Sequence, residues 1–207
     1  LVPPLSKGAF YHAGQVCVSV KRIYLPQAHA ARFAEKLAEA AVKLKVGKAE
    51  DKDTDIGPLI RESECQRVHT WVSEAASEGA VILTGGKTAP AGANYYLPTV
   101  LLNPHADSKV SQLETFGPVV CIYGYEDIAS AIASANSLSC AFQAAVFGKD
   151  MARLIKCATA LNATAVMIND HTAFRVDWMP FGGRKESGLG MGGIYHSALE
   201  MSQEKLM

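Results

Sequence analysis

The sequence predicts an α/β protein that forms a three-layer α/β/α sandwich around a mostly parallel sheet. From Val18 onward, short runs of β-branched and aromatic residues alternate with helical patterns, which is typical of the crossover units that connect parallel strands. Several strand-like runs are apolar on both faces, as strands are when helices cover both sides of a sheet. With 49% apolar residues in a chain of 207, there is enough apolar surface for a buried core.

The expected elements follow one another in a regular order. The first helical pattern is closed by Gly14, and in the next one Phe33, Leu37 and Leu44 recur at helical spacing. The expected helices are Lys7–Ala13, His29–Leu44, Glu62–Glu78, Ile128–Asn136, Met151–Leu161 and a short one around Ser197. The expected strands are Val18–Leu25, Ala80–Thr84, Tyr95–Leu102, Val119–Tyr125, Ala141–Phe147 and Ala165–Asn169. The expected loops are Gly47–Pro58, Gly85–Asn94 and Pro180–Gly193.

Charge and composition narrow the range of partners. Twenty Lys and Arg residues balance twenty Asp and Glu residues, so no net field attracts nucleic acid or an anionic membrane. The five cysteines are widely spaced, with no C-x-x-C pair and no zinc-ligand spacing, which indicates a reduced cytoplasmic protein without a metal site. No apolar run approaches the ~20 residues of a membrane span. The chain starts at Leu1 without an initiator Met, and we interpret this as a cut within a longer protein.

Cys17 stands between a helical segment and the first expected strand. Side chains and backbone groups converge where loops meet the ends of strands in open α/β sheets, so a thiol there can act as a nucleophile. A cysteine between two valines can equally be a small core residue, because free cysteine is often buried. The residues around Cys17 leave both interpretations open.

A second motif runs from Glu114 to Pro118 and places an acid and an aromatic residue one position apart. Its Gly-Pro pair fixes the backbone, so Glu114 and Phe116 should point in defined directions, as a ligand-binding loop requires. The carboxylate could then hold a ribose diol. A solvated glutamate before a tight turn is the alternative.

The third motif is the glycine-rich run from Pro180 to Gly190. Its order fits neither G-x-x-x-x-G-K-[ST] nor G-x-G-x-x-G, and no strand leads into it, so a phosphate-binding loop is excluded. The glycines are better explained by close packing of backbone segments, with Phe181 lining a pocket.

Taken together and in this order, Gly14-Gln15-Val16-Cys17, Glu114-Thr115-Phe116-Gly117-Pro118 and the Pro180–Gly190 motif resemble the aldehyde dehydrogenase superfamily. The resemblance also includes Lys21-Arg22-Ile23-Tyr24-Leu25 and Asp55-Ile56-Gly57-Pro58-Leu59-Ile60, and it spans residues 1–207 as a catalytic domain. It implies that Cys17 attacks an aldehyde and that the resulting thiohemiacetal gives hydride to NAD or NADP. A thioester is then hydrolysed to a carboxylic acid.

The resemblance also assigns roles to the surrounding residues. It implies that the Cys17 backbone N–H is one oxyanion donor, that Glu114 holds the nicotinamide ribose and that Phe116 lies beside the ring. Four further residues match positions that line the aldehyde tunnel: Tyr11, Val16, Val18 and Phe181. The family's general-base glutamate and its oxyanion asparagine lie upstream of the cysteine and have no match here. We therefore expect that the cofactor-binding domain is absent from this chain, that the chain alone is inactive, and that the complete enzyme is a homodimer or homotetramer.

Two regions bear on specificity. The segment Asn169–Asp177 is similar to a branch of the superfamily whose members include enzymes for small, often anionic aldehydes. Arg175 is thus a candidate for binding an anionic group of the substrate, and an ion pair between Arg175 and Asp177 is the alternative. Met191-Gly192 stands where the family usually has Arg-Glu, which weakens inferences about contacts of that loop.

Two other functions are left open, a CoA-acylating relative and a catalytically dead binding protein, although a scaffold would need neither Cys17 nor Glu114.

Overall fold

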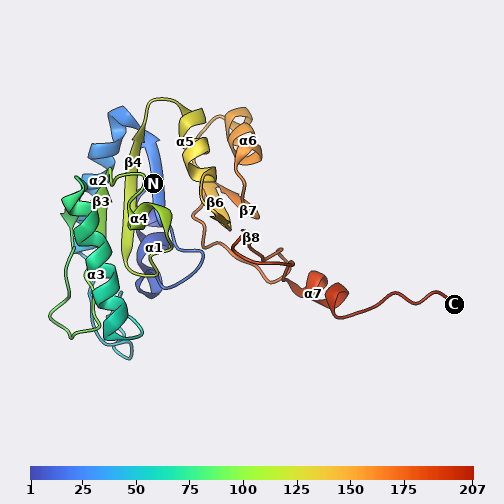
Figure 1. Cartoon of the computed structure of the whole chain (residues 1–207), viewed down its shortest axis with the longest axis horizontal. Coiled ribbons are helices and arrows are strands. Elements are labelled where there is room, and N and C mark those ends of the chain that lie inside the picture. The colour runs from blue at the N-terminus through green and yellow to red at the C-terminus, as the bar shows by residue number, and fades with distance from the viewer. The chain divides into compact units, whose positions relative to one another are not determined.

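The computed structural model describes residues 1–207, which divide into two compact units, Leu1–Ala131 and Ile132–Met207. The first unit is built on a four-stranded sheet with the order β1-β4-β3-β2 (Figure 1). Its strands are β1 (Arg22–Pro26), β2 (Val81–Thr84), β3 (Thr99–Leu102) and β4 (Val119–Tyr125). β4 pairs in parallel with both β1 and β3, while β2 runs antiparallel to β3 at the edge.

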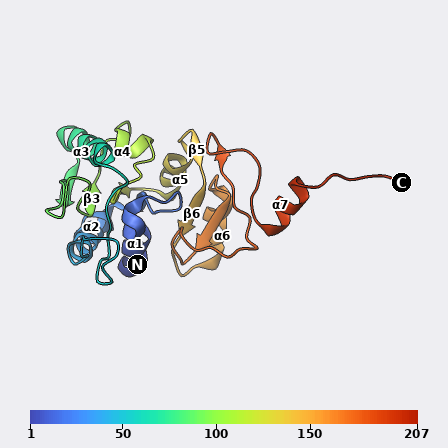
Figure 2. The same ribbon diagram turned by 90° about the horizontal axis from the view of Figure 1, so that it is seen from below.

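Helices cover both faces of this sheet. The helices of the first unit are α1 (Val2–Phe10), the 3-10 helix η1 (Tyr11–Gly14), α2 (Gln27–Val42), α3 (Glu62–Ser77) and the short α4 (Lys109–Gln112). Figure 2 shows α1 and α2 on one side of the sheet and α3 and α4 on the other. The consecutive residues Val119 to Ile122 of β4 are all at most 2% exposed, because both faces of the strand are covered. The predicted α/β class with its mostly parallel, helix-covered sheet is confirmed.

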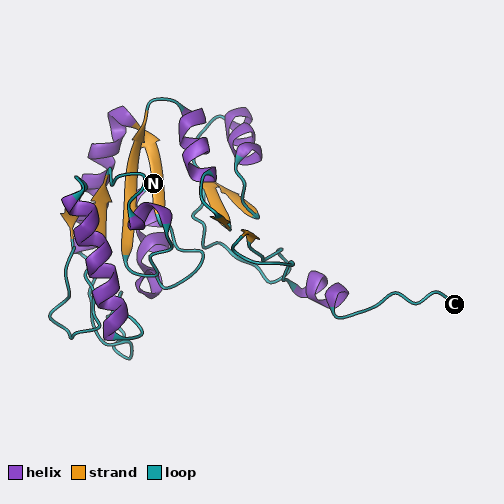
Figure 3. Ribbon diagram, in the orientation of Figure 1, coloured by secondary structure: helices purple, strands orange, loops and turns teal.

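The second unit has shorter elements. A parallel pair, β6 (Gln143–Val146) and β7 (Ala165–Ile168), is connected by α6 (Met151–Ala160), which begins at the N-cap residue Asp150. A separate antiparallel pair joins β5 (Cys140–Ala141) to β8 (Arg184–Lys185), and α7 (Ile194–Glu200) follows (Figure 3). Helix α5 (Ile128–Asn136) contains the boundary between the units and has the bounds that the sequence predicts.

Several predicted boundaries are wrong, chiefly around the motif that ends at Cys17. Helix α1 starts earlier than Lys7, because prolines occupy its first turn, where no backbone N–H is needed. It ends at Phe10 rather than Ala13, because His12 and Ala13 adopt left-handed backbone angles with φ of 50° and 55°. The strand expected from Val18 begins only at Arg22, because the residues before it form a turn. The strand expected over Ala141–Phe147 is divided into β5 and β6.

Two further observations concern the whole chain. None of its helices combines the length and the apolar character needed to cross a membrane. No group of three or more His, Cys, Asp or Glu side chains is arranged to hold a metal ion.

Candidate active site

Cys17 lies on an exposed turn before β1. The Ser19 N–H donates to the Val16 carbonyl oxygen at 3.0 Å and closes the turn around Cys17. The Val20 N–H donates to the Gly8 carbonyl oxygen at 3.0 Å, which fastens the end of the turn to α1. The Cys17 thiol is free and exposed, so the interpretation of Cys17 as a small core residue is wrong.

The other cysteines differ from Cys17 in their surroundings. Cys65 and Cys121 are buried, and burial raises the pKa of both thiols, that of Cys121 to about 12. Cys140 and Cys157 are of intermediate exposure. Since the thiolate is the reactive form, the two buried thiols are poor nucleophiles and Cys17 is the most accessible of the five.

Three predicted pocket residues lie beside Cys17. Val16 and Val18 are its half-buried neighbours in the chain, and Tyr11 is half-buried at the start of η1. Partial burial raises the pKa of Tyr11, and the negative charge of a Cys17 thiolate raises it further. The structure thus brings Tyr11, Val16, Val18 and Cys17 together.

The loop from Glu114 to Pro118 exposes its acid and its aromatic ring. Thr115 between them is buried, and Phe116 has a φ of 44°, a left-handed conformation that is uncommon outside glycine. Partial burial raises the pKa of the Glu114 carboxyl, while the ammonium of Lys21 opposes this shift. Glu114 and Phe116 therefore both reach solvent, on either side of an anchored Thr115.

The topology of the sheet brings this loop to Cys17. Cys17 precedes β1 and Glu114–Pro118 precedes β4, and these two strands are parallel neighbours. Both loops therefore lie at the same, amino-terminal end of the sheet. Gly14, with a φ of 67°, packs so closely on the other loop that a Cβ built on it would overlap the carbonyl oxygen of Gly117. Only glycine fits this position, because it tolerates both the angle and the contact.

Lys21 links the same two loops through its side chain. Its Nζ donates to the Gly14 carbonyl oxygen at 2.5 Å and to the Gly117 carbonyl oxygen at 3.4 Å. Nζ also lies 5.8 Å from the centroid of the Phe116 ring, within the range of a cation–π interaction. No local signal in the sequence predicts a role for Lys21, which stands within the longer match Lys21-Arg22-Ile23-Tyr24-Leu25.

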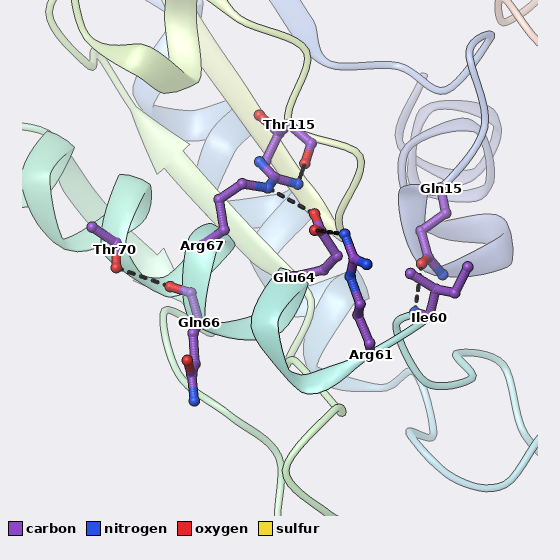
Figure 4. Close-up of polar contacts among 8 residues, drawn as sticks. All are labelled: Gln15, Ile60, Arg61, Glu64, Gln66, Arg67, Thr70 and Thr115. Atoms are coloured by element: carbon purple, nitrogen blue, oxygen red, sulfur yellow. Dashed lines mark hydrogen bonds and ion pairs between the residues drawn. The ribbon is translucent and has the colours of Figure 1, made fainter.

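Two more residues that sequence reasoning missed hold the loops in place. Arg67 on α3 donates from Nη2 to the Thr115 carbonyl oxygen at 2.7 Å and from Nε to Glu64 at 2.8 Å (Figure 4). Gln15 accepts from the Ile60 N–H at 2.9 Å and donates to the Pro58 carbonyl oxygen at 3.2 Å. The signal for Gln15 was its place in the motif before Cys17. Nothing local in the sequence singles out Arg67.

The second unit holds the remaining predicted residues. The guanidinium carbon of Arg175 lies 4.1 Å from the centroid of the Phe181 ring, so the two predicted pocket residues stack on each other. The structure forms no ion pair between Arg175 and Asp177, which was the alternative partner. Phe181 also packs edge-on against Phe142 at 4.9 Å.

The glycine-rich loop around Phe181 packs backbone against backbone. Phe181 and Gly192 exchange hydrogen bonds of 2.9 and 2.7 Å. A Cβ on Gly183 would overlap the carbonyl group of Ser187. This agrees with the close packing that the sequence predicts for these glycines.

The fold and the site define a class of protein, an α/β domain that presents an accessible cysteine and an acid–aromatic loop at one end of a parallel sheet. The chain belongs to the aldehyde dehydrogenase family, whose model matches residues 1–207.

Three similar proteins were found. A 3-sulfolactaldehyde dehydrogenase from Priestia megaterium is 42% identical over 203 residues, which are 98% of this chain and 42% of that protein. A lactaldehyde dehydrogenase from Methanococcus maripaludis is 36% identical over 199 residues, 96% of this chain and 42% of that protein. The crystal structure of glyceraldehyde-3-phosphate dehydrogenase GapN from Methanocaldococcus jannaschii, complexed with NADP, superposes with a TM-score of 0.91 at 39% identity and covers 98% of this chain and 43% of that one. The chain thus spans less than half the length of these relatives.

Proposed function

We propose that this chain is the catalytic domain of an NAD(P)-dependent aldehyde dehydrogenase that oxidises an aldehyde to a carboxylic acid. One observation carries the proposal: the exposed Cys17 thiol lies on a turn that packs, through Gly14, against the loop bearing Glu114 and Phe116. Oxidation by hydride transfer requires that the aldehyde carbon be held by the nucleophile while it faces the cofactor ring. A nucleophile and a cofactor-holding loop in direct contact meet that requirement.

The exposed residues of the second loop fit a nicotinamide nucleotide. An ionised Glu114 offers only acceptors, which suits the paired hydroxyls of a ribose. The Phe116 ring is 38% exposed and offers a flat apolar surface to an aromatic ring. When bound, the nicotinamide supplies the hydride acceptor. We propose that Glu114 holds the ribose and that Phe116 supports the ring.

The covalent chemistry is assigned to Cys17. Its thiolate adds to the aldehyde carbon, a C–S bond forms, and the carbonyl electrons move to the oxygen, where the Cys17 backbone N–H can donate. Loss of hydride from that carbon leaves a thioester on Cys17, and water then cleaves the C–S bond to release the acid and the thiol. Tyr11, Val16 and Val18 flank the thiol and would contact the substrate chain.

Two parts of this chemistry are proposed to lie outside the chain. No residue here matches the general base that activates water or the second oxyanion donor that the family resemblance implies. We therefore expect the purified 207-residue chain to show no aldehyde turnover. Turnover by this chain alone would contradict the assignment of the base to another part of the complete enzyme.

A small anionic aldehyde is the proposed substrate. The name of the Priestia megaterium relative indicates a sulfonated aldehyde, and that of the GapN structure a phosphorylated one. Arg175 is exposed, stacks on Phe181 and is not paired with Asp177, so its guanidinium is available for an anionic group. The Methanococcus maripaludis relative is named for an uncharged aldehyde, which makes lactaldehyde the natural comparison substrate.

The test is nicotinamide reduction by the complete enzyme with sulfolactaldehyde, succinate semialdehyde and lactaldehyde, each with NAD and with NADP. Arg175→Ala should raise KM for the two anionic aldehydes by about tenfold or more, as expected for loss of a charge-assisted pair, and leave lactaldehyde nearly unchanged. Arg153→Ala, on the exposed surface of α6, is the matched control. An equal rise in KM for all three aldehydes would contradict the anion-binding role.

The same assay addresses the alternative functions. Stimulation by CoA would indicate an acylating enzyme, and absence of turnover with every aldehyde, with or without CoA, would indicate a binding protein. Neither alternative is favoured by the relatives that were found.

We also propose that the complete enzyme is a cytoplasmic homodimer or homotetramer. The five unpaired cysteines support a reducing compartment, where thiols persist. Light scattering of the complete enzyme tests the assembly.

A further inference from the structure

Lys21 occupies a position between the two loops of the candidate site. It is the last residue before β1, and its backbone carbonyl oxygen accepts from the Cys121 N–H of β4 at 2.9 Å. Its backbone is therefore fixed to the sheet, while its side chain reaches Gly14 in one loop and Gly117 in the other. One ammonium group thus holds a carbonyl oxygen from each loop.

Packing alone does not explain a lysine here. Burial lowers the pKa of Lys21 to about 8 from its ordinary value of 10.5, so the ammonium form is costly at this position. The other groups that act on it are Glu114 and Cys121, which raise its pKa, and Arg67, which lowers it. A methionine would fill similar space without that cost, but it could not donate to the two carbonyl oxygens.

We propose that Lys21 is a positioning residue that sets the turn bearing Cys17 against the loop bearing Glu114 and Phe116. The side chain bridges Gly14 and Gly117, and its ammonium lies over the Phe116 ring. This inference rests on the proposed function for its kinetic consequences, but the bridge itself is a property of the fold.

The Lys21 bridge would set the distance between the Cys17 thiol and the nicotinamide ring. Cys17 is three positions from Gly14, and Phe116 is next to Gly117, so loosening the bridge shifts the nucleophile relative to the cofactor ring. A displacement of about 1 Å at reacting groups can reduce the rate by about 100-fold. Loosening the bridge should lower the rate of hydride transfer. It should not lower the reactivity of the Cys17 thiol toward small reagents, because that thiol stays exposed.

The experiment compares Lys21→Met, Lys21→Arg and the control Lys36→Met, which replaces an exposed lysine of α2, in the complete enzyme. Lys21→Met should lower kcat by about 10- to 100-fold and weaken cofactor binding, with Cys17 alkylation by iodoacetamide within about threefold of wild type. Lys21→Arg retains the charge and donors and should restore part of kcat. Lys21→Arg should also remove any change in kcat with pH that is centred near pH 8, because arginine stays protonated. Wild-type kcat and cofactor affinity in Lys21→Met would overturn the proposal.

A measurement without substrate keeps this inference separate from the proposed function. Hydrogen exchange of peptides covering residues 12–19 and 114–118 should become faster in both segments of Lys21→Met and in neither segment of Lys36→Met. If the wild-type enzyme oxidises no aldehyde, the proposed function fails. The hydrogen-exchange rates of the two segments then remain as the test of the positioning role of Lys21. Unchanged exchange in both segments would then overturn it.

Discussion

Gly14 and Gly117 are in van der Waals contact through their backbones, although they lie in distant parts of the sequence. A side chain on Gly14 would occupy the place of the Gly117 carbonyl group. The same two residues supply the carbonyl oxygens that Lys21 bridges. The contact joins the turn that carries the thiol to the loop that carries the acid and the aromatic ring.

Gly14→Ala should damage both stability and the site. The new methyl group cannot be accommodated without moving one loop, and the left-handed φ of 67° adds backbone strain. We expect a loss of about 2 kcal/mol or more in unfolding free energy, measured by urea denaturation. Gly79→Ala is the control, because it has a φ of 106° but no atom within 4 Å of the new methyl group. Equal losses in the two variants would mean that strain, and not the contact with Gly117, is responsible.

Cys17 should be the first thiol to react in the native protein. Under native conditions, a thiol reagent such as DTNB should give one fast phase of about one equivalent, because Cys65 and Cys121 are buried. Cys17→Ser should remove this phase and Cys157→Ser should keep it. A fast phase that survives in Cys17→Ser would show that another thiol is the accessible one.

Arg67→Met should loosen the Glu114–Pro118 loop. The substitution removes the donor to the Thr115 carbonyl oxygen and the partner of Glu64. We expect a loss of about 1–2 kcal/mol in unfolding free energy and faster hydrogen exchange in the loop. Arg61→Met removes the other, exposed partner of Glu64 and should cost less than about 0.5 kcal/mol. Similar losses in both variants would contradict a specific role for the bond to Thr115.

Lys21 should make stability depend on pH. Its pKa is about 8 in the folded chain and 10.5 ordinarily, so between these values the unfolded chain binds more protons. The cost of burying the ammonium is fully present below about pH 8 and is relieved as the pH rises toward 10.5. The unfolding free energy of wild type minus that of Lys21→Met should therefore increase from pH 7.5 to pH 9.5. A difference that stays flat or decreases over this range would contradict the lowered pKa.

The sequence predicts the main elements well and their ends near the motifs poorly. Helix α5 and most of α3 and α6 agree with the apolar periodicity, because amphipathic helices show their buried face in the sequence. The end of α1 was misplaced because His12 and Ala13 adopt left-handed backbone angles, and the start of β1 was misplaced because the residues before it form a turn. Local sequence preferences disfavour left-handed angles at residues other than glycine, and so they do not predict this conformation.

The motif residues of the site could be predicted, but their supports could not. Cys17, Glu114 and Phe116 stand in recognisable patterns, and the parallel pairing of β1 with β4 explains why their loops meet. Lys21 and Arg67 act on carbonyl oxygens far away in the sequence, and such contacts leave no local pattern. Arg175 and Phe181 were predicted separately, and their stacking emerged only in three dimensions.

The central claim is that Cys17 is the nucleophile of an aldehyde-oxidising enzyme, and nicotinamide reduction by the complete enzyme tests it most directly. We expect Cys17→Ala to abolish aldehyde-dependent reduction while cofactor binding is retained, and Cys157→Ala to keep wild-type activity. Aldehyde-dependent reduction at the wild-type rate in Cys17→Ala would contradict the account.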